Sequence, residues 1–338
     1  MAAVMQMLMA AWTSQTVAAV TRLGVPDLIH AHGPLTAHEL TGRHGVDARP
    51  EHLERALRAC AGAGIFTESP EGRFGATPRS EVLTLASPAS VKRFAELIGG
   101  RWWTLFGGLP EALRTGESQA RALLGPEPTG PARTRQLEEF AQAMRSRVDS
   151  TRGAVEGHDF SDVTTVVDVG GGLGHLAIAV LRRHPRARAL VLDLPDVIAL
   201  AERDAAGAPP DVRARLSFVG GDMFADVPPG DCYVLKAIVH DWDDARARRV
   251  LANCRARLTL GGRVLCVDNV LPPMGDTGGA GTKLLDMLMM VSLPGKERTE
   301  AEWRALYEAA GLRLTSITLI NPRSGESIIQ GVPAEATR

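Results

Sequence analysis

The fold of this chain is decided by VVDVGGGLGHLAIAVLRRHPRARALVLDLP, residues 166–195. The stretch begins with a short apolar run that predicts a buried strand, and a turn with glycine at four of five positions, 170–174, follows. Residues 173–184 continue at helical spacing, and residues 189–192 predict a second strand that ends in Asp193. A glycine turn lets the backbone approach a ligand closely, and an acid at that strand end can accept hydrogen bonds from ribose hydroxyls. The stretch therefore predicts a nucleotide-binding α/β unit.

The glycine spacing bears on which nucleotide is bound. The dinucleotide fingerprint requires glycine at its first, third and sixth positions, and the sixth position counted from Gly170 is His175. Counted from Asp168, the run is Asp-x-Gly-x-Gly-x-Gly, which resembles the S-adenosylmethionine (SAM) loop of class I methyltransferases. A cationic sulfonium ligand has no pyrophosphate to place on a helix N-terminus, so that sixth glycine is not required. The loop alone leaves NAD as an alternative.

Composition is that of an ordinary globular protein of about two domains. The 338 residues are 45% hydrophobic and 23% charged, and the net charge of −1 argues against a polyanion as the main partner. The cysteines form no C-x-x-C pair and predict buried thiols in a reducing compartment: Cys60, Cys232, Cys254 and Cys266. Residues 1–20 carry no charged side chain, but they lack a basic region and polar residues interrupt them. We therefore expect no membrane span and predict a cytoplasmic protein.

The N-terminal part predicts helices and a hairpin. Residues 4–23 form a helical pattern that is apolar nearly all round, and we favour a second subunit over the helix's own domain as its cover. Helices at 35–44 and 51–61 and a hairpin at 65–76 complete a winged-helix pattern. The 51–61 helix carries two glutamates and two arginines rather than a basic face, so we expect no nucleic-acid partner.

Polar side chains follow the strands predicted after Asp193. Strands are expected at 216–219, 233–238 and 264–267, and parallel sheets place ligands outside the carboxyl ends of their strands. Four side chains are therefore expected to converge on one crevice: Asp193, Asp222, His240 and Asp268. The apolar helices that precede the glycine loop are expected either to cover the ligand or to pack only in the core.

Six motifs occur in one order between Val166 and Trp303: VVDVGGGLG, DLPDV, GGDMF, LKAIVHDWDD, GGRVLCVDNVLP and GKERTEAEW. Together they resemble the SAM-dependent O-methyltransferases of the plant caffeate/flavonoid type and their bacterial natural-product relatives. The resemblance implies an α/β class I methyltransferase fold with a mostly parallel Rossmann-like sheet and an N-terminal α-helical, winged-helix-like dimerisation domain. It implies these boundaries: dimerisation domain 1–98 and SAM-binding catalytic domain 99–338, the latter with a helical roof 99–158 and a Rossmann-like core 159–338.

The resemblance also implies roles for individual residues. The SAM-binding set is Asp168, Gly170, Gly172, Asp193, Leu194, Asp222, Met223, Phe224 and Lys236. Within it, Asp193 would bind the ribose hydroxyls, and Asp222 would flank the adenine with Met223. His240 would be the general base on the acceptor hydroxyl, with Glu297 and Asp268 as its carboxylate partners. The candidates for binding an aromatic acceptor are Trp103, Phe106, Phe140, Met144, Asp241, Met287 and Met290.

The chemistry of methyl transfer is consistent with a histidine at this position. Methyl transfer from a sulfonium is an in-line displacement, and positioning supplies much of its rate. Full ionisation of an ordinary phenol by an unshifted imidazole crosses about 3.5 pK units, or about 5 kcal/mol. Proton removal is therefore expected during methyl transfer, or from a hydroxyl that its ring already makes acidic. A carboxylate on the far imidazole nitrogen would fix the tautomer and raise the basicity.

Asp268 departs from the family, which usually has glutamate at this position. The Asp268-Asn269 pair also resembles the ligand pair of the small, metal-dependent catechol-type methyltransferases, and Asp241 offers a third oxygen for magnesium. His240 and the full set of motifs favour the metal-free alternative. We therefore predict a homodimeric SAM-dependent O-methyltransferase acting on a hydroxyl, expected to be phenolic, of a small aromatic secondary metabolite. The alternatives are a C-methyltransferase or a non-methylating relative on the same fold, and a SAM-responsive winged-helix regulator.

Overall fold

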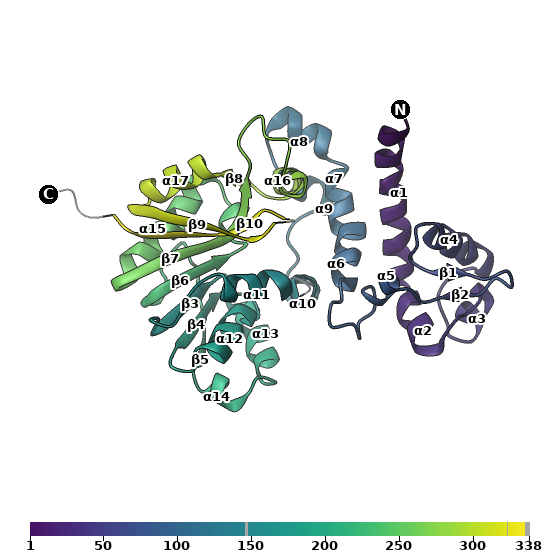
Figure 1. Cartoon of the computed structure of the whole chain (residues 1–338), viewed down its shortest axis with the longest axis horizontal. Coiled ribbons are helices and arrows are strands. Elements are labelled where there is room, and N and C mark those ends of the chain that lie inside the picture. Colours follow the sequence, from purple (N-terminus) through teal and green to yellow (C-terminus); the bar gives the residue numbers. More distant parts are fainter. Residues whose placement is uncertain (146–147, 323, 335–338) are drawn as a thin grey trace. The chain divides into compact units, whose positions relative to one another are not determined.

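The structure, a computed structural model, describes residues 1–145, 148–322 and 324–334. Its elements are shown in Figure 1. The chain divides into two compact units: Met1–Thr104 with Gln142–Ser146, and Leu105–Ala141 with Arg147–Arg338. Helices α7 (Trp103–Phe106) and α10 (Gly130–Arg145) cross this division. No helix in the described ranges has the length and apolarity needed to cross a membrane.

The first unit consists of short helices and a hairpin around an apolar core. Its elements are α1 (Ala2–Arg22), α2 (Val25–His32), α3 (Ala37–Gly42), α4 (Pro50–Gly62), β1 (Thr67–Glu68), β2 (Phe74–Gly75), α5 (Pro78–Glu81), α6 (Lys92–Leu97) and the π-helical η1 (Ile98–Trp102). Thr36 and Glu39 form a capping box at the start of α3. The Thr36 hydroxyl accepts from the Glu39 amide, and the Glu39 carboxylate accepts from the Thr36 amide.

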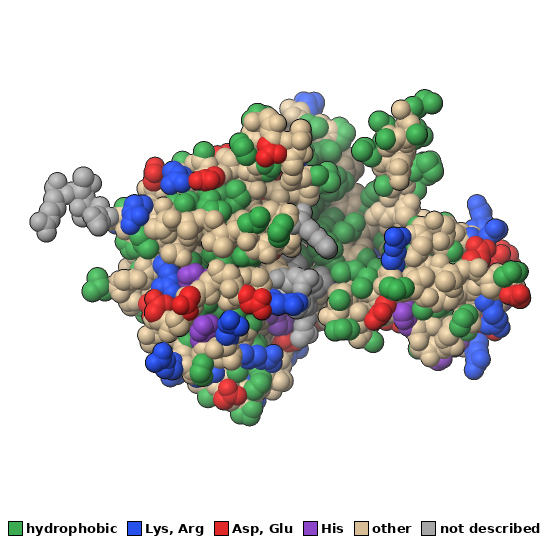
Figure 2. Space-filling view, in the orientation of Figure 1, with side chains coloured by type: hydrophobic (Ala, Val, Ile, Leu, Met, Phe, Trp, Pro, Cys, Tyr) green, Lys and Arg blue, Asp and Glu red, His purple; other side chains and the backbone are tan. Residues whose placement is uncertain are grey.

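Helix α1 keeps much of its apolar surface exposed. Its buried residues are confined to the last turns, whereas the Leu8 side chain is 62% exposed and the Trp12 side chain 70% exposed. Figure 2 shows hydrophobic side chains gathered along the N-terminal part of this helix. Large exposed apolar patches are typical of interaction surfaces rather than of free solvent-facing helices.

The second unit is an α/β structure built around an eight-stranded sheet. Its helices are α8 (Leu109–Thr115), α9 (Ala120–Leu124), α11 (Val148–Glu156), α12 (His175–Arg183), α13 (Pro195–Ala205), α14 (Pro210–Arg213), η2 (Val239–Asp241), α15 (Asp244–Arg257), α16 (Ala280–Ser292) and α17 (Glu300–Ala309). Its strands are β3 (Thr165–Val169), β4 (Arg188–Asp193), β5 (Leu216–Gly220), β6 (Gly230–Lys236), β7 (Leu258–Leu271), β8 (Arg298–Thr299), β9 (Leu312–Asn321) and β10 (Glu326–Pro333).

The order of the strands reverses its direction at the middle of the sheet. The order is β5-β4-β3-β6-β7-β10-β9, with β8 paired to the end of β7. Strands β3 to β7 are parallel, and β10 and β9 close the sheet as an antiparallel pair. The chain moves outward from β3 to β5 and then returns to the other side of β3, so the direction of winding reverses between β3 and β6. Such a switch point is where α/β sheets bind nucleotides, outside the carboxyl ends of the strands.

Alternating side chains of the central strands enter two different cores. On β7, Val264 and Cys266 pack with residues of α15 and α17, whereas Leu265 and Val267 pack with residues of α11 and α12. Helices therefore cover both faces of the sheet, which explains why its strands are apolar on both sides. This alternation continues to the functional end of β7, where Asp268 points to the α15–α17 face and Asn269 to the opposite face.

The structure corrects the boundaries of two predicted strands. The strand expected at 233–238 is β6, Gly230–Lys236. The strand expected at 264–267 begins earlier, at Leu258, and it extends through Asn269 to Leu271. Gly261 and Gly262 lie inside this strand, next to a register shift between β6 and β7. The pairing of Leu258 with Gly230 of β6 holds this segment extended. The sequence around Leu258 does not predict this pairing, because Gly230 is distant in the chain.

Candidate active site

The glycine loop after β3 is held by the acid that ends β4. The Gly172 amide donates to Asp193 Oδ2 at 2.9 Å and the Leu194 amide donates to Asp193 Oδ1 at 2.7 Å. Gly170 has φ of 67°, and a Cβ there would lie 2.4 Å from the Ile238 side chain, so only glycine fits. Gly172 also has a positive φ, but a Cβ there would meet no atom within 4 Å, so space remains open beside the loop.

Two carboxylates give the loop an acidic environment. Asp168 on β3 is fully buried, and burial raises the pKa of its carboxyl to about 7, against the opposing effect of Lys236. Burial also raises the pKa of Asp193, while the amides of Gly172 and Leu194 oppose the change. A cationic ligand placed here would favour the ionised forms of both acids.

The segment after β5 turns back on itself beside an aromatic pair. Asp222 Oδ1 accepts from the Phe224 amide at 2.9 Å, and the Met223 carbonyl accepts from the Asn253 side chain. The Phe224 ring meets the Trp242 ring edge to face, with centroids 4.8 Å apart. The structure therefore places the GGDMF motif next to the chain that follows His240.

His240 lies on a short 3₁₀ turn, η2, that follows β6. Ala237, between the strand and the turn, has φ of 55°, and among the described residues it alone has a positive φ without being glycine. This strained conformation redirects the chain out of the sheet. The imidazole is only 6% exposed, and its Nδ1 lies 2.7 Å from Glu297 Oε1. Because an ionised carboxylate can only accept, Nδ1 carries a proton, and in the neutral ring Nε2 is the basic nitrogen.

Two further carboxylates flank the imidazole. Asp268 Oδ1 lies 3.7 Å from Nδ1, and Asp241 Oδ1 lies 3.5 Å from Nε2. Burial by itself lowers the pKa of His240, but the charges of Asp268, Glu297 and Asp241 outweigh it and raise the pKa to about 9. The shorter side chain of Asp268 thus acts on the ring through charge at a distance, and Glu297 makes the close hydrogen bond.

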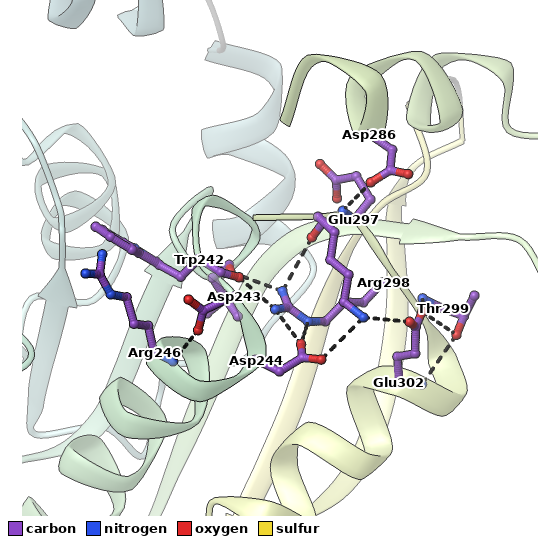
Figure 3. A network of polar contacts seen from close by, with 11 residues as sticks. Trp242, Asp243, Asp244, Arg246, Asp286, Glu297, Arg298, Thr299 and Glu302 are labelled. Carbon is purple, nitrogen blue, oxygen red and sulfur yellow. Dashed lines mark hydrogen bonds and ion pairs between the residues drawn. The ribbon is translucent and has the colours of Figure 1, made fainter. Parts of the chain in front are cut away.

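The segment Gly295–Arg298 contacts the turn that carries His240. Figure 3 shows Arg298 of this segment bonded to Trp242 and Asp244. A Cβ on Gly295 would lie 1.9 Å from the His240 carbonyl oxygen, so the two backbones touch. The Glu297 amide donates to Asp286 on α16 at 2.8 Å, which fixes the residue that holds the imidazole. Arg298 is fully buried and bonds to the carbonyl groups of Val239 and Trp242. This segment is the GKER motif, from which the sequence predicted Glu297 but neither Gly295 nor Arg298.

The predicted acceptor-binding residues are distributed over both units. Trp103 and Met144 belong to the first unit, and Phe106, Phe140, Met287 and Met290 to the second. Met287 and Met290 are half-buried on α16, the helix whose Asp286 holds the Glu297 backbone. Phe106 and Phe140 are exposed. The Asp241 carboxylate lies beside the imidazole, with its Oδ1 3.5 Å from Nε2.

The Asp268-Asn269 pair does not form one ligand set. Its two side chains point to opposite faces of β7, and the Asn269 amide donates to the Ser324 carbonyl and the Thr282 hydroxyl. No group of three or more His, Cys, Asp or Glu side chains with metal-binding geometry occurs in the part of the chain that the structure describes.

Comparison with known proteins gives the same assignment over nearly the whole chain. The profile of the O-methyltransferase domain matches residues 130–313, and that of the O-methyltransferase dimerisation domain matches residues 5–86. A phenazine O-methyltransferase of Lysobacter antibioticus is 34% identical, over 97% of this chain and 95% of the relative. The crystal structure of human N-acetylserotonin methyltransferase with SAM has a TM-score of 0.87 at 26% identity, covering 98% of this chain and 96% of that one.

An O-methyltransferase of neocarzinostatin biosynthesis was solved with S-adenosyl-L-homocysteine and 1,4-dihydroxy-2-naphthoic acid. It has a TM-score of 0.79 at 29% identity, covering 95% of this chain and 96% of that one. The two matched profiles lie in the same order as the two parts predicted from the sequence, the dimerisation domain before the catalytic one. The chain therefore belongs to the O-methyltransferase family.

Proposed function

We propose that the protein uses SAM to methylate a phenolic or related hydroxyl of a small aromatic metabolite, with His240 as the general base. The observation that carries this proposal is the buried imidazole, bonded through Nδ1 to Glu297 at 2.7 Å and carried on the turn after β6, the strand beside β3 and its glycine loop. The family assignment supports methyl transfer to oxygen, and the relative bound to a dihydroxynaphthoic acid supports an aromatic hydroxyl as the acceptor.

The residues at the carboxyl ends of β3 and β4 fit SAM. The open space at Gly172 leaves room for a ligand against the loop backbone, and Asp168 and Asp193 offer negative charge to a cationic ligand. We assign the loop to the methionine part and Asp193 to the ribose. SAM supplies an electrophilic methyl group on a positively charged sulfur. The chain's part is to align the acceptor oxygen with that methyl and to remove its proton.

The shifted pKa of His240 changes the energetics of proton removal. An ordinary phenol has a pKa of about 10, so transfer to an imidazole whose conjugate acid has a pKa of about 9 is uphill by only about 1.4 kcal/mol. The carboxylates that raise this pKa also keep the ring protonated in the free protein at neutral pH. The reactive complex therefore holds one proton fewer than the resting protein and the neutral phenol together. It contains either imidazole with phenol or imidazolium with phenolate.

Incubation of the protein with labelled SAM and a panel of phenols, with and without chelator, tests this proposal. We expect label in the ether oxygen's methyl group and the same rate in the presence of chelator, since Asp268 and Asn269 point apart. Label on a carbon atom of the acceptor would mean that the protein is a C-methyltransferase rather than an O-methyltransferase. The absence of transfer to any aromatic acceptor would contradict the proposal. Loss of activity with chelator would overturn the metal-free assignment.

The pH dependence of methyl transfer follows from the pKa of His240. For an acceptor with a pKa above about 10, kcat/KM is expected to rise about tenfold per pH unit from pH 7 and to bend near pH 9, because the proton must leave the imidazolium. The Glu297→Gln variant removes an anion and a charge-assisted hydrogen bond from Nδ1, so its bend is expected at lower pH. The Glu308→Gln variant, on the exposed side of α17, serves as the control and keeps the original profile. A bend that stays in place in Glu297→Gln would contradict the assignment.

The pKa of His240 also affects folding stability. It lies above the ordinary value of 6.5, so the stabilisation from the imidazolium is complete below about pH 6.5 and is lost as the pH rises through about 9.

The proposal includes a homodimer formed through residues 1–98, with residues 99–338 as the catalytic part. The match of a dimerisation-domain profile to residues 5–86 and the exposed apolar side chains of α1 support this interface. On the composition of the sequence alone we also propose a cytoplasmic location.

A further inference from the structure

We infer that Arg298 is a positioning residue for the general base, because it holds the turn on which His240 is carried. This inference rests on the proposed function. The guanidinium donates through Nη1 to the Val239 carbonyl at 3.1 Å and through Nη2 to the Trp242 carbonyl at 2.8 Å. These two carbonyl groups bracket His240 and Asp241, so one planar side chain spans the turn from its first residue to the residue that follows it.

The turn depends on this support because its own hydrogen bonds are few and long. The Asp241 amide lies 3.2 Å from the Ile238 carbonyl, and the Trp242 amide lies 3.3 Å from the Val239 carbonyl. The chain enters the turn through Ala237, whose positive φ is strained. A short 3₁₀ turn with such bonds has little rigidity of its own, so an outside donor that binds both ends decides where His240 stands.

Arg298 is itself anchored at both ends (Figure 3). Its backbone belongs to β8 and pairs with Val270 on β7, the strand that carries Asp268. Its Nε and Nη2 bond to Asp244 Oδ1, at 2.9 and 2.8 Å, at the first residue of α15. The guanidinium is fully buried, and the Asp244 carboxylate compensates its charge. A fork with donors fixed in one plane suits these simultaneous contacts, whereas a lysine ammonium presents a point charge.

Two neighbouring residues, Glu297 and Arg298, therefore orient the base through different contacts. Glu297 holds the imidazole ring through Nδ1, and Arg298 holds the backbone of the turn. The imidazole stays bonded to Glu297 only while the backbone of the turn stays in place relative to the Glu297 carboxylate. Loss of the Arg298 contacts would let the turn shift relative to Glu297, and a displacement of about 1 Å at a reacting group can cost about 100-fold in rate.

The test compares Arg298→Met and Arg298→Lys with Arg304→Met as a matched control. Arg304 forms an exposed ion pair with Glu300 one turn along α17. Each variant is assayed with two acceptors, an ordinary phenol and a nitro-substituted phenol that is already ionised at the assay pH. We expect Arg298→Met to lose about 100-fold in kcat on the ordinary phenol and less than about tenfold on the ionised one, with an unchanged Kd for SAM. Arg298→Lys is expected to fall between, and Arg304→Met to match the original protein.

A second measurement does not depend on activity. Titration of ¹⁵N-labelled histidine by NMR reports the pKa of His240, which we expect to fall in Arg298→Lys, where the positive charge is kept, as the ring separates from Glu297. If the original protein transfers no methyl group, the proposed function fails, and this titration still decides whether Arg298 holds the turn. Equal loss on both acceptors, or a His240 pKa unchanged in Arg298→Lys, would overturn the inference. The lysine variant keeps the buried charge, so it carries the test if the methionine variant does not fold.

Discussion

The His240→Ala variant is expected to lose about 10²- to 10⁴-fold in methyl transfer to a phenol of ordinary acidity, the range that a positioned general base contributes. The imidazole is the basic group that Glu297 orients, and the deletion leaves Glu297 and Asp268 as buried carboxylates without their cationic partner. Both carboxylates lie on the Nδ1 side of the ring, away from the basic Nε2, so neither stands where the base would take the proton of the acceptor.

The measurement for His240→Ala combines turnover of labelled SAM with calorimetry of SAM binding. Calorimetry is expected to give a Kd for SAM close to that of the original protein. The residues assigned to SAM, the loop at Gly172 and Asp193, are bonded to each other and not to His240. An acceptor already ionised at the assay pH should recover most of the lost rate. His52→Ala, an exposed histidine of α4, is the control and should leave turnover unchanged. Full activity of His240→Ala on an ordinary phenol would mean that positioning alone drives the reaction.

The Gly295→Ala variant is expected to disturb the same turn from outside, with a loss of about 100-fold in kcat. The added methyl would lie 1.9 Å from the His240 carbonyl oxygen and 2.6 Å from the Trp242 amide nitrogen, so one of the two backbones must move. Overpacking of this kind also costs about 1–3 kcal/mol of stability. Steady-state kinetics and thermal unfolding of the same preparations measure the two effects separately.

The matched control for Gly295→Ala is Gly62→Ala. Gly62 ends α4, has an ordinary φ, and a Cβ there would meet no atom within 4 Å. That variant should keep the kcat of the original protein and gain up to about 1 kcal/mol of stability, because alanine restricts the unfolded chain. Original kcat in Gly295→Ala would show that the turn tolerates displacement and would contradict the role assigned to the Gly295–Arg298 segment.

The sequence predicts well those features that depend on local pattern. The strand, glycine turn and helix at 166–184 appear as β3, the loop and α12, because apolar runs and glycines act within a few residues. The pairing of His240 with Glu297 joins residues 57 positions apart, and only the resemblance to a family predicted it.

The features that the sequence does not predict are set by distant contacts. Alanine is not typical of the left-handed region, so nothing in the sequence marks Ala237; its conformation follows from the need to lead the chain out of β6. Arginine is usually found at the surface, so the sequence does not predict that Arg298 is buried. Its burial results from contacts with Val239, Trp242 and Asp244, which are distant in the chain. The sequence also does not tell whether the shorter side chain of Asp268 approaches the imidazole. In the structure, Asp268 Oδ1 lies 3.7 Å from His240 Nδ1.

The alternation of side chains along β7 has a consequence for how this catalytic site tolerates insertions and deletions. The strand pairs with β6 on one side and β10 on the other, so its phase is fixed along both edges. Removal of a single residue between Arg263 and Asp268 would bring Asn269 to the place of Asp268, so that an amide faces the imidazole in place of a carboxylate. Insertion of one residue would bring Val267 to that place. The extended segment that contains Gly261 and Gly262 lies next to a register shift. Length variation among natural or designed variants should therefore concentrate there, upstream of the acidic residue.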